Sequence, residues 1–415
     1  MVSVDFVFTG LYQPPVAFLP GTSAQPGVDG PPVDWAWLRS VLVDAIASAE
    51  LVLARLQNGV VAFGQIEAAI ARLDDRLADL IDCVGSRLPR ASRTAGEMDE
   101  RAYQSFVDDF GLLLAEACAI YDGYFGVVRI SAMTLLQRTA QVAATAQAVL
   151  RDLPYTLLDR MQIVMVIANI RHMLKTVAYR FPSEGSLVPD SPAAQPAHQG
   201  AEAVRRAYRQ CWLSQGNGGV EWSQAVAFYR WKVGHHFFNL CTIFWTDALR
   251  EACSAIAEGD EETGVTQLAL ADSFLRGTTA AMWYAGDFPA VVYQACVRPS
   301  MVMPGKASGF SGDQNADYNR MKDAKERLKK VLRQKYGPAL AALPARLRNV
   351  LMDFHEADIE DSENHLIIAA HKVGTDQSLS QKEWQAELPD SIYRQKAVDV
   401  LREIAESKRR EFKEV

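Results

Sequence analysis

Residues 231–245 read W-K-V-G-H-H-F-F-N-L-C-T-I-F-W, and this stretch decides the fold that we predict. Five of its side chains recur at steps of three and four residues and therefore share one stripe of a helix: Trp231, His235, Phe238, Thr242 and Trp245. An imidazole on such an inward face is costly unless a carbonyl, a metal or a ligand satisfies it. A core histidine bonded to a backbone carbonyl is the ordinary explanation, and a ligand-binding histidine is the alternative.

The segments on either side of this stretch carry the same helical period. Predicted helices precede it at residues 35–57, 64–87, 97–128, 130–153 and 155–179. Others follow it at residues 263–285, with Gly286 as C-cap, and at the basic segment 318–335. Alternation typical of strands is nearly absent. We therefore predict an all-α protein, a large helical bundle assembly with an N-terminal helical extension.

Composition divides the chain into three predicted parts. A length of 415 residues exceeds what one ordinary core needs. Residues 11–34 are rich in Pro and Gly and predict an extended arm on the surface. Residues 183–204 predict a linker or a mobile flap, because prolines and glycines break the helical pattern there. The parts are an N-terminal arm and helical region at 1–182, the linker or flap at 183–204, and a second helical region at 205–415.

Charge and hydrophobicity exclude several classes of protein. A formal net charge of −7 argues against a nucleic-acid partner. No uncharged apolar run is long enough to span a membrane, and the first residues lack a secretory signal, so we predict a cytoplasmic protein. The cysteines lack metal-type spacing and are predicted to be reduced core residues: Cys83, Cys118, Cys211, Cys241, Cys253 and Cys296.

The order of motifs from residue 231 onward resembles the tryptophan 2,3-dioxygenase superfamily of heme enzymes. In that family a helix carrying F-x-x-x-H-Q-x-x-E-L-W is followed by a G-D turn, a D-F step and an S-G-F loop. Here Trp231 stands at the Phe position and His235 at the distal histidine. The later steps match at Gly259-Asp260, Asp287-Phe288 and Ser308-Gly309-Phe310. Downstream, the segment from His365 to Gly374 keeps the family spacing between its proximal histidine and a glycine.

The resemblance implies a heme-binding region at 205–415, with His365 as the proximal ligand of heme b. His235 would lie on the distal face, where it donates a hydrogen bond or moves a proton. Glu363 or Asp361 would accept the other ring N–H of the ligand. His371, six residues after His365, ranks second as ligand.

The same resemblance implies a pocket for an aromatic substrate. Trp231, Phe238 and Phe310 would form its walls, and Ser308 and Gly309 would belong to the loop that closes over the heme. A family arginine holds the substrate carboxylate through its two-pronged guanidinium. Tyr293 stands near that point in this sequence, so Arg298 is the candidate.

Two departures from the family's sequence pattern narrow the predicted function. The residues after Gly374 lack the family's glycine loop, which disfavours tryptophan cleavage and favours a divergent oxygenase of natural-product pathways. The tyrosine hydroxylase, methyltyrosine hydroxylase and pyrrolnitrin ring-rearranging types are examples. No cysteine follows Cys296, so we expect non-covalent heme b. We predict an oxidoreductase, a mono- or dioxygenase or hydroxylase, that inserts oxygen from O2 or H2O2 into an aromatic amino acid or a related indole or phenol. A homo-oligomer is possible by the same resemblance.

Two other functions fit the sequence. The chain could be a non-catalytic heme-binding helical protein. It could also be a non-heme, metal-dependent all-α enzyme, because metal-capable side chains are dense between residues 355 and 371: His355, Glu356, Asp358, Glu360, Asp361, Glu363, His365 and His371. A carboxylate-bridged di-metal site needs Glu-x-x-His pairs on two helices, which this chain lacks, so we favour the heme interpretation.

Overall fold

The computed structural model describes residues 17–20, 35–57, 63–84, 100–131, 133–180, 219–302, 312–373 and 397–411. These ranges are almost wholly helical, which confirms the predicted all-α class. The longer helices are α2 (Trp35–Gln57), α3 (Phe63–Val84), α4 (Glu100–Phe110), α5 (Leu112–Phe125), α6 (Leu135–Asp152), α7 (Arg160–Tyr179), α9 (Gly219–Glu258), α10 (Glu261–Ala285), α13 (Ala316–Tyr336), α14 (Ala345–Lys372) and α16 (Ala397–Glu411). Short elements are η2 (Leu153–Tyr155), α11 (Ala290–Val292), η3 (Tyr293–Val297), α12 (Arg298–Ser300), η4 (Gly312–Gln314), η5 (Leu340–Ala342), β1 (Ala17–Pro20) and β2 (Val127–Ile130).

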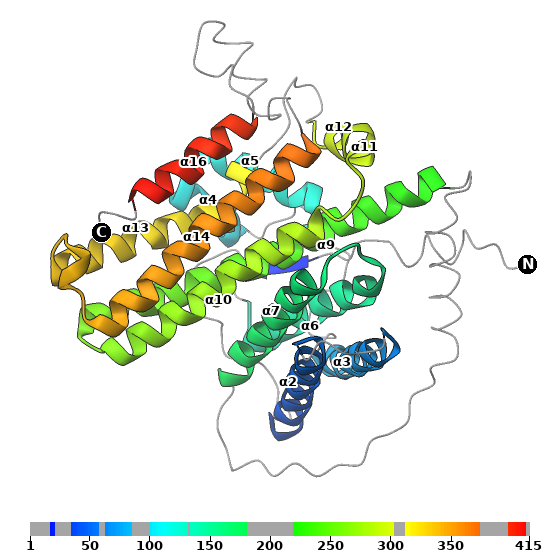
Figure 1. The fold of residues 1–415 in the computed structure, drawn as a ribbon, viewed down its shortest axis with the longest axis horizontal. Coiled ribbons are helices and arrows are strands. Elements are labelled where there is room, and N and C mark those ends of the chain that lie inside the picture. Colours follow the sequence, from blue (N-terminus) through cyan, green and yellow to red (C-terminus); the bar gives the residue numbers. More distant parts are fainter. Residues whose placement is uncertain are drawn as a thin grey trace, which may run out of the picture.

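Helices α9 and α10 form a long hairpin through the middle of the molecule (Figure 1). Its turn contains Gly259 at a φ of 94°, a conformation that glycine adopts without strain. Asp260 caps α10 by accepting a hydrogen bond from the Thr263 N–H at 3.0 Å. A Cβ on Gly234 would lie 2.4 Å from the Cβ of Ala285. The two helices can therefore cross closely only because Gly234 lacks a side chain, and this crossing fixes the turn of α9 that carries His235.

Two further helices pack on this hairpin, and a third helix covers one of them. Helix α14 lies against α10, α13 lies against α9, and α16 covers α14 (Figure 1). Trp245 of α9 meets Phe354 of α14 with ring centroids 5.9 Å apart, so the two helices touch near the middle of the bundle. The arrangement leaves α9 and α14 on either side of a common interior.

The N-terminal helices form a second group, in which α2 packs on α3 and α7, and α7 packs on α10. One continuous hydrophobic core nevertheless extends from α2 to α14 and joins the predicted N-terminal region to the predicted region at 205–415. The predicted linker at 183–204 lies outside the described residues.

The single helix predicted at 97–128 is wrong, because two glycines interrupt it. Gly111, at a φ of 78°, separates α4 from α5, and Gly126, at a φ of 73°, ends α5. The chain then enters β2, which pairs in parallel with β1 so that Ala17 lies opposite Val127. The four-residue run V-V-R-I is too short to show alternation, so the sequence pattern did not reveal this strand.

Two fully buried arginines tie distant elements together. Arg129 donates to both carboxylate oxygens of Asp122 and of Asp317, at 2.8–3.0 Å. Arg230 donates to Asp152 at 2.7 and 3.1 Å and to the Asp287 carboxylate at 2.8 Å. Buried guanidinium groups need such multiple partners, so the first cluster joins β2, α5 and α13, and the second holds the end of α6 and the loop after α10 on α9.

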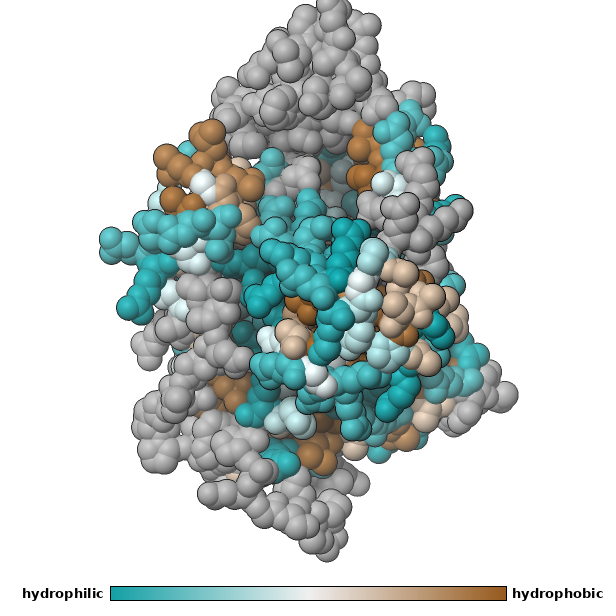
Figure 2. Space-filling model, turned by 90° about the vertical axis from the view of Figure 1, so that its left-hand side faces the viewer, coloured by the Kyte–Doolittle hydropathy of each residue, from teal (hydrophilic) through white to brown (hydrophobic). Residues whose placement is uncertain are grey.

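The face of the molecule shown in Figure 2 is largely hydrophilic, with scattered apolar patches. Within the described ranges, no helix has the length and apolar character needed to cross a bilayer. The five cysteines that the structure describes are all free: Cys83, Cys118, Cys241, Cys253 and Cys296.

Candidate functional site

The aromatic stripe on α9 changes character along its length. Trp231, His235 and Phe238 are only half-buried, whereas Thr242 and Trp245 are buried in the core. The first half of the stripe therefore borders accessible space inside the bundle, and the second half only packs. His235 itself is enclosed by rings, because Phe125 stacks on it at 4.0 Å and Trp231 lies 4.3 Å away between ring centroids.

The tautomer of His235 follows from its hydrogen bond. Its Nδ1 lies 2.6 Å from the carbonyl oxygen of Trp231, and a carbonyl can only accept, so Nδ1 carries the proton and donates. Burial is the largest cause that lowers the pKa of His235, to about 3. The ring is therefore neutral near pH 7, and its Nε2 presents a lone pair. His235 thus has features of both a core histidine and a ligand-binding histidine. One ring nitrogen is bonded to a backbone carbonyl, and the other is left for a ligand or a proton.

His236 points away from this space. Its Nε2 donates to the Phe125 carbonyl oxygen at 2.6 Å, and its side chain is only 1% exposed. The role of His236 is therefore to hold the end of α5 against α9. Burial, as the largest cause, lowers its pKa to about 4.

The pH dependence of the free energy of unfolding tests whether His236 is buried as a neutral ring. Below pH 6.5 the unfolded chain protonates His236 while the folded chain does not, so the unfolded state binds more protons and stability is lost as pH falls. Between pH 6.5 and about pH 5, the free energy of unfolding should fall in both the wild type and His236→Gln, whose glutamine can still donate to Phe125. We expect this fall to be about 2 kcal/mol smaller in His236→Gln. Denaturant titrations at both pH values measure this difference. Parallel losses in the two proteins would contradict it.

His365 lies on α14, and its side chain is exposed. Desolvation by the surrounding protein is the main cause that lowers its pKa. A charge on His365 also lowers the pKa of His235, so the two imidazoles lie within electrostatic range of each other. The distant segments that carry them are thus brought together.

The acidic cluster around His365 separates into paired groups. Asp358 accepts from Lys325 and, at 2.8 Å, from Lys408, while Glu363 pairs with Arg409. Within the described part of the chain, no group of three or more His, Cys, Asp or Glu side chains is placed to hold a metal ion. Asp358 and Glu363 thus bind α14 to α13 and α16.

Asp361, one helical turn before His365, is held differently. Its Oδ1 accepts hydrogen bonds from the hydroxyls of Thr278 at 2.9 Å and Thr279 at 2.8 Å. Burial is the largest cause that raises the pKa of Asp361, to about 6. Because Glu363 is engaged with Arg409 at the surface, Asp361 is the better of the two predicted partners for the His365 ring.

Further aromatic groups wall the space beside Trp231. The rings of Tyr293 and Phe288 lie 5.8 and 6.5 Å from the Trp231 ring, both edge-on. Phe238 faces Tyr318 at 6.5 Å. Sequence reasoning did not find Phe125 or Tyr293 as wall residues, because their contacts with α9 join segments far apart in the chain.

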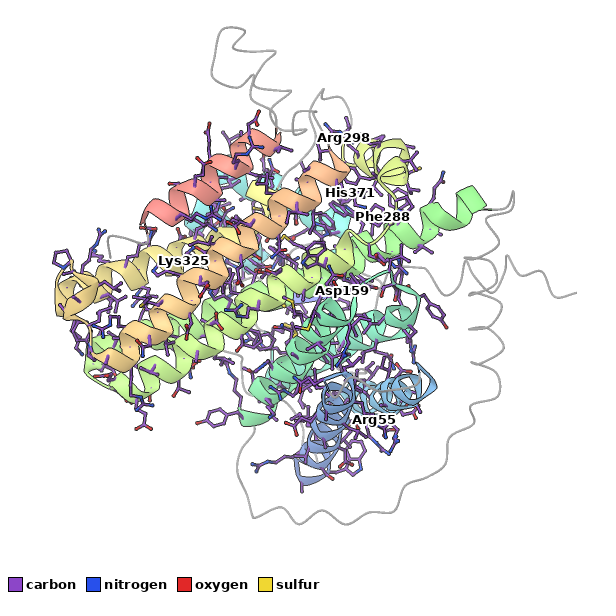
Figure 3. The ribbon with its side chains drawn as sticks, in the orientation of Figure 1. Arg55, Asp159, Phe288, Arg298, Lys325 and His371 are labelled. Carbon is purple, nitrogen blue, oxygen red and sulfur yellow. The ribbon has the colours of Figure 1, made fainter. Side chains whose placement is uncertain are left out.

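Arg298 and His371 lie at the same end of the bundle as Phe288, whereas Lys325 lies farther along (Figure 3). Arg298 is 6% exposed, and its charge acts on Tyr293, where it opposes the rise in pKa that burial causes. The predicted substrate arginine thus borders the aromatic wall. His371 is exposed at the end of α14. The predicted loop residues Ser308, Gly309 and Phe310 lie outside the described residues.

Asn239 and Cys241, which replace polar and aromatic residues of the resembled family, have packing roles. Asn239 accepts a hydrogen bond at 2.7 Å from Asn315, the N-cap of α13. Cys241 is buried against Gly277, whose missing side chain leaves room for the sulfur. Both residues position α9 against its neighbours and lie in the core.

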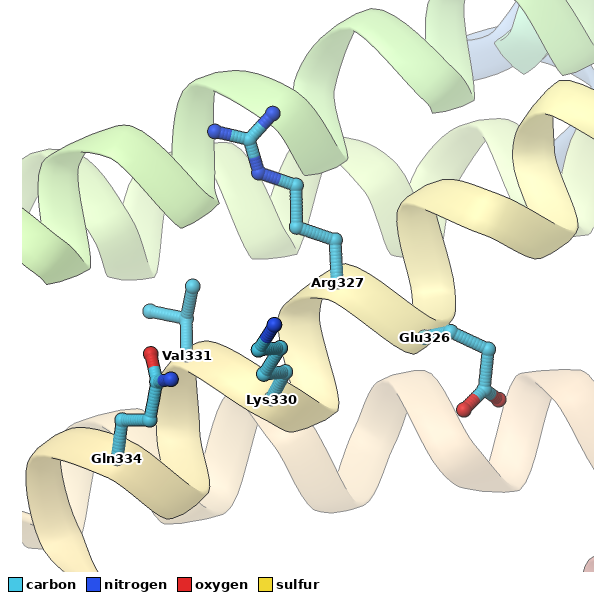
Figure 4. Close-up of a pocket in the computed structure, with 5 residues that line it drawn as sticks. All are labelled: Glu326, Arg327, Lys330, Val331 and Gln334. Carbon is cyan, nitrogen blue, oxygen red and sulfur yellow. The ribbon is translucent and has the colours of Figure 1, made fainter. Parts of the chain in front are cut away.

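A groove on α13 is separate from this site. Glu326, Arg327, Lys330, Val331 and Gln334 line it, and Arg327 reaches from α13 toward the neighbouring helix (Figure 4). The charge of Arg327 acts on Cys253, eighteen residues after His235 on α9 and thus about 27 Å along the helix. The groove therefore has no part in the chemistry around His235.

Comparison with known proteins identifies the family. A family model described as SfmD 3-methyl-L-tyrosine peroxygenase matches residues 53–349, well over half of the chain. The chain belongs to this peroxygenase family. The matched range contains His235, Trp231 and Arg298, and it ends before His365.

Two other comparisons add little. No curated protein matches the chain. A crystal structure of reduced SfmD, soaked with sodium hydrosulfite, is 17% identical, and the alignment covers 83% of this chain and 97% of that one at a TM-score of 0.38. A TM-score of 0.38 is too low to transfer any feature of that structure.

Membership in the peroxygenase family makes the protein a heme-dependent oxidoreductase that transfers oxygen to an aromatic amino acid. The predicted oxygenase class and the predicted heme are thereby confirmed. The donor set agrees with this cofactor, since His235 and His365 both have lowered pKa values and a neutral imidazole is a ligand of heme iron. The placement in the tryptophan 2,3-dioxygenase superfamily stays a prediction.

Proposed function

We propose that the protein is a peroxygenase that hydroxylates the ring of a tyrosine derivative, with heme b held between α9 and α14. His365 would hold the heme iron, and His235 would act on the oxidant from α9. The observation that supports this most strongly is the pair of imidazoles, one from each helix, that lie within electrostatic range of each other. Asp361 orients the ligand ring from one turn before it.

When bound, heme supplies the iron at which the O–O bond of the oxidant is cleaved and from which oxygen reaches the substrate ring. His235 acts on the proton of the oxidant. Because Nδ1–H is committed to the Trp231 carbonyl, only Nε2 is available, and in the neutral ring it accepts a proton. Of the two roles predicted for His235, proton transfer fits this tautomer, and hydrogen-bond donation requires that Nε2 first be protonated.

The substrate binds against the aromatic wall. Trp231, Tyr293 and Phe288 offer ring edges and faces to a phenol, which suits the family's modified tyrosine. Arg298 lies at the border of this wall and binds the substrate carboxylate. The family name supports hydrogen peroxide over O2 as the oxidant.

Purified protein tests this proposal directly. We expect a Soret band and peroxide-dependent hydroxylation of 3-methyl-L-tyrosine, with no cleavage of L-tryptophan under O2. A Soret band without turnover of any aromatic amino acid would indicate a non-catalytic heme protein. A colourless protein after reconstitution with heme would refute the heme site.

His235→Gln is expected to lower kcat by about 10²–10⁴-fold, because the base that takes the peroxide proton is lost. The deficit should shrink as pH rises, since ionised peroxide needs no base. The matched control is His236→Gln on the neighbouring position, which retains the bond to Phe125 and should turn over as the wild type does. Steady-state rates across pH measure both variants, and a pH-independent deficit would contradict the proposed role of Nε2.

A further inference from the structure

Lys232 is a half-buried cation beside the candidate site. It follows Trp231 on α9 and precedes His235 by three residues, so it lies next to the accessible half of the stripe. Its Nζ is 5.3 Å from the centroid of the Tyr124 ring. Within the described residues, no carboxylate forms an ion pair with Lys232, and desolvation alone lowers its pKa.

Three other cations of this protein are paired with carboxylates: Arg129 and Arg230 each bind two aspartates, and Lys325 binds Asp358. The buried Lys372 instead donates to the backbone carbonyl of Phe288 and lies over the Phe288 ring. An ammonium group removed from water without a counter-charge is costly, and a cation–π contact offsets only part of that cost. A carboxylate beside the half-buried Lys232 would supply the counter-charge that it lacks among the described residues.

The surroundings of Lys232 are polar on one side and aromatic on the other. The hydroxyl of Tyr124, whose ring Lys232 contacts, shares a hydrogen bond of 2.7 Å with the Ser300 hydroxyl of α12, two residues after Arg298. The Trp231 indole N–H is buried without a partner in hydrogen-bond geometry, although it lies near enough to the Tyr124 hydroxyl to oppose the rise in its pKa. Donors thus gather beside Lys232, while aromatic rings lead from there to His235.

We propose that Lys232 binds the carboxylate of a molecule held in this site. An anion placed between Lys232 and the hydroxyls of Tyr124 and Ser300 supplies the missing counter-charge, and the rest of the molecule then extends along Trp231 toward His235. The proposal rests on the proposed function, which provides two sources of this chemistry: the carboxylate of the amino-acid substrate, which Lys232 would share with Arg298, and a propionate of heme.

Lys232→Met tests the proposal, because it keeps the length and removes the charge. If the substrate is the source, calorimetry on the heme-loaded protein should show about 10- to 100-fold weaker binding of 3-methyl-L-tyrosine. Binding of the matching amine without a carboxylate should be unchanged. If heme is the source, titration of heme-free protein should show weaker binding of heme and unchanged binding of heme dimethyl ester. Lys232→Arg should recover part of the loss in either case.

The control is Lys322→Met on α13. Lys322 makes a comparable contact, 4.6 Å from the Tyr318 ring centroid, but it is exposed. It should bind both ligands as the wild type does. If wild type binds heme and amino acid and Lys232→Met does so equally well, the proposal for Lys232 is overturned and the proposed function stands. If wild type binds neither, both are overturned.

Discussion

His365→Ala is expected to abolish the Soret band of the purified protein and to lower peroxide-dependent turnover by more than about 100-fold. Loss of an outer partner of a metal ligand costs about 10–100-fold, and loss of the ligand itself removes the bond to iron. The absorbance spectrum after heme reconstitution and the rate of substrate hydroxylation measure the two effects.

The matched control for this prediction is His371→Ala, on the same helix and exposed at its end. It should keep both the spectrum and the rate. Because the His365 side chain is exposed, its truncation should leave the helical circular dichroism unchanged, so a lost Soret band is not explained by unfolding. A Soret band that survives His365→Ala but disappears in His235→Ala would move the axial ligand to α9.

Arg129→Met is expected to lower the free energy of unfolding by about 3–5 kcal/mol, because it leaves two buried carboxylates without their counter-charge. Arg129 is 0% exposed, and both Asp122 and Asp317 depend on it. Denaturant titration at neutral pH measures the loss. Since Asp317 lies in the first turn of α13, the same variant should loosen the end of α13 that packs near Phe238.

Two further variants distinguish the contribution of the buried Arg129 cluster to stability from that of a surface ion pair. Lys175→Met removes an exposed pair with Glu50 and should cost less than about 1 kcal/mol. Asp122→Asn with Asp317→Asn, combined with Arg129→Met, should recover part of the lost stability because no unpaired charge is then buried. Equal losses for Arg129→Met and Lys175→Met would show that the buried cluster contributes no more than a surface pair.

Much of the helical framework was predictable from local pattern. The helix predicted at 35–57 matches α2, and the helix predicted at 263–285 differs from α10 only at its first turn. The predicted break at Gly259-Asp260 and the C-cap at Gly286 are present. Apolar periodicity and capping residues act within a few positions of the chain, so these features are visible without any tertiary contact.

The incorrect predictions concern segments whose local sequence pattern was ambiguous. Residues 97–128 have an apolar period throughout, and Gly111 and Gly126 looked tolerable within it. Their positive φ values turn the chain, so that α4 packs against α5 and β2 leaves α5 to pair with β1. The cluster of acids near His365 likewise resembled a metal site until Lys408 and Arg409, more than forty residues away, were seen to bind it.

The sequence by itself determined that the chain is helical, where its long helices lie, and which two histidines were the candidates for a heme site. Only the tertiary structure decided that His235 and His365 lie within electrostatic range of each other, that Phe125 covers the first of them, and that Lys232 lies half-buried without a carboxylate among the described residues. The physical reason is that helical periodicity is a property of neighbouring residues. Desolvation and charge pairing instead depend on segments that meet only when the chain has folded.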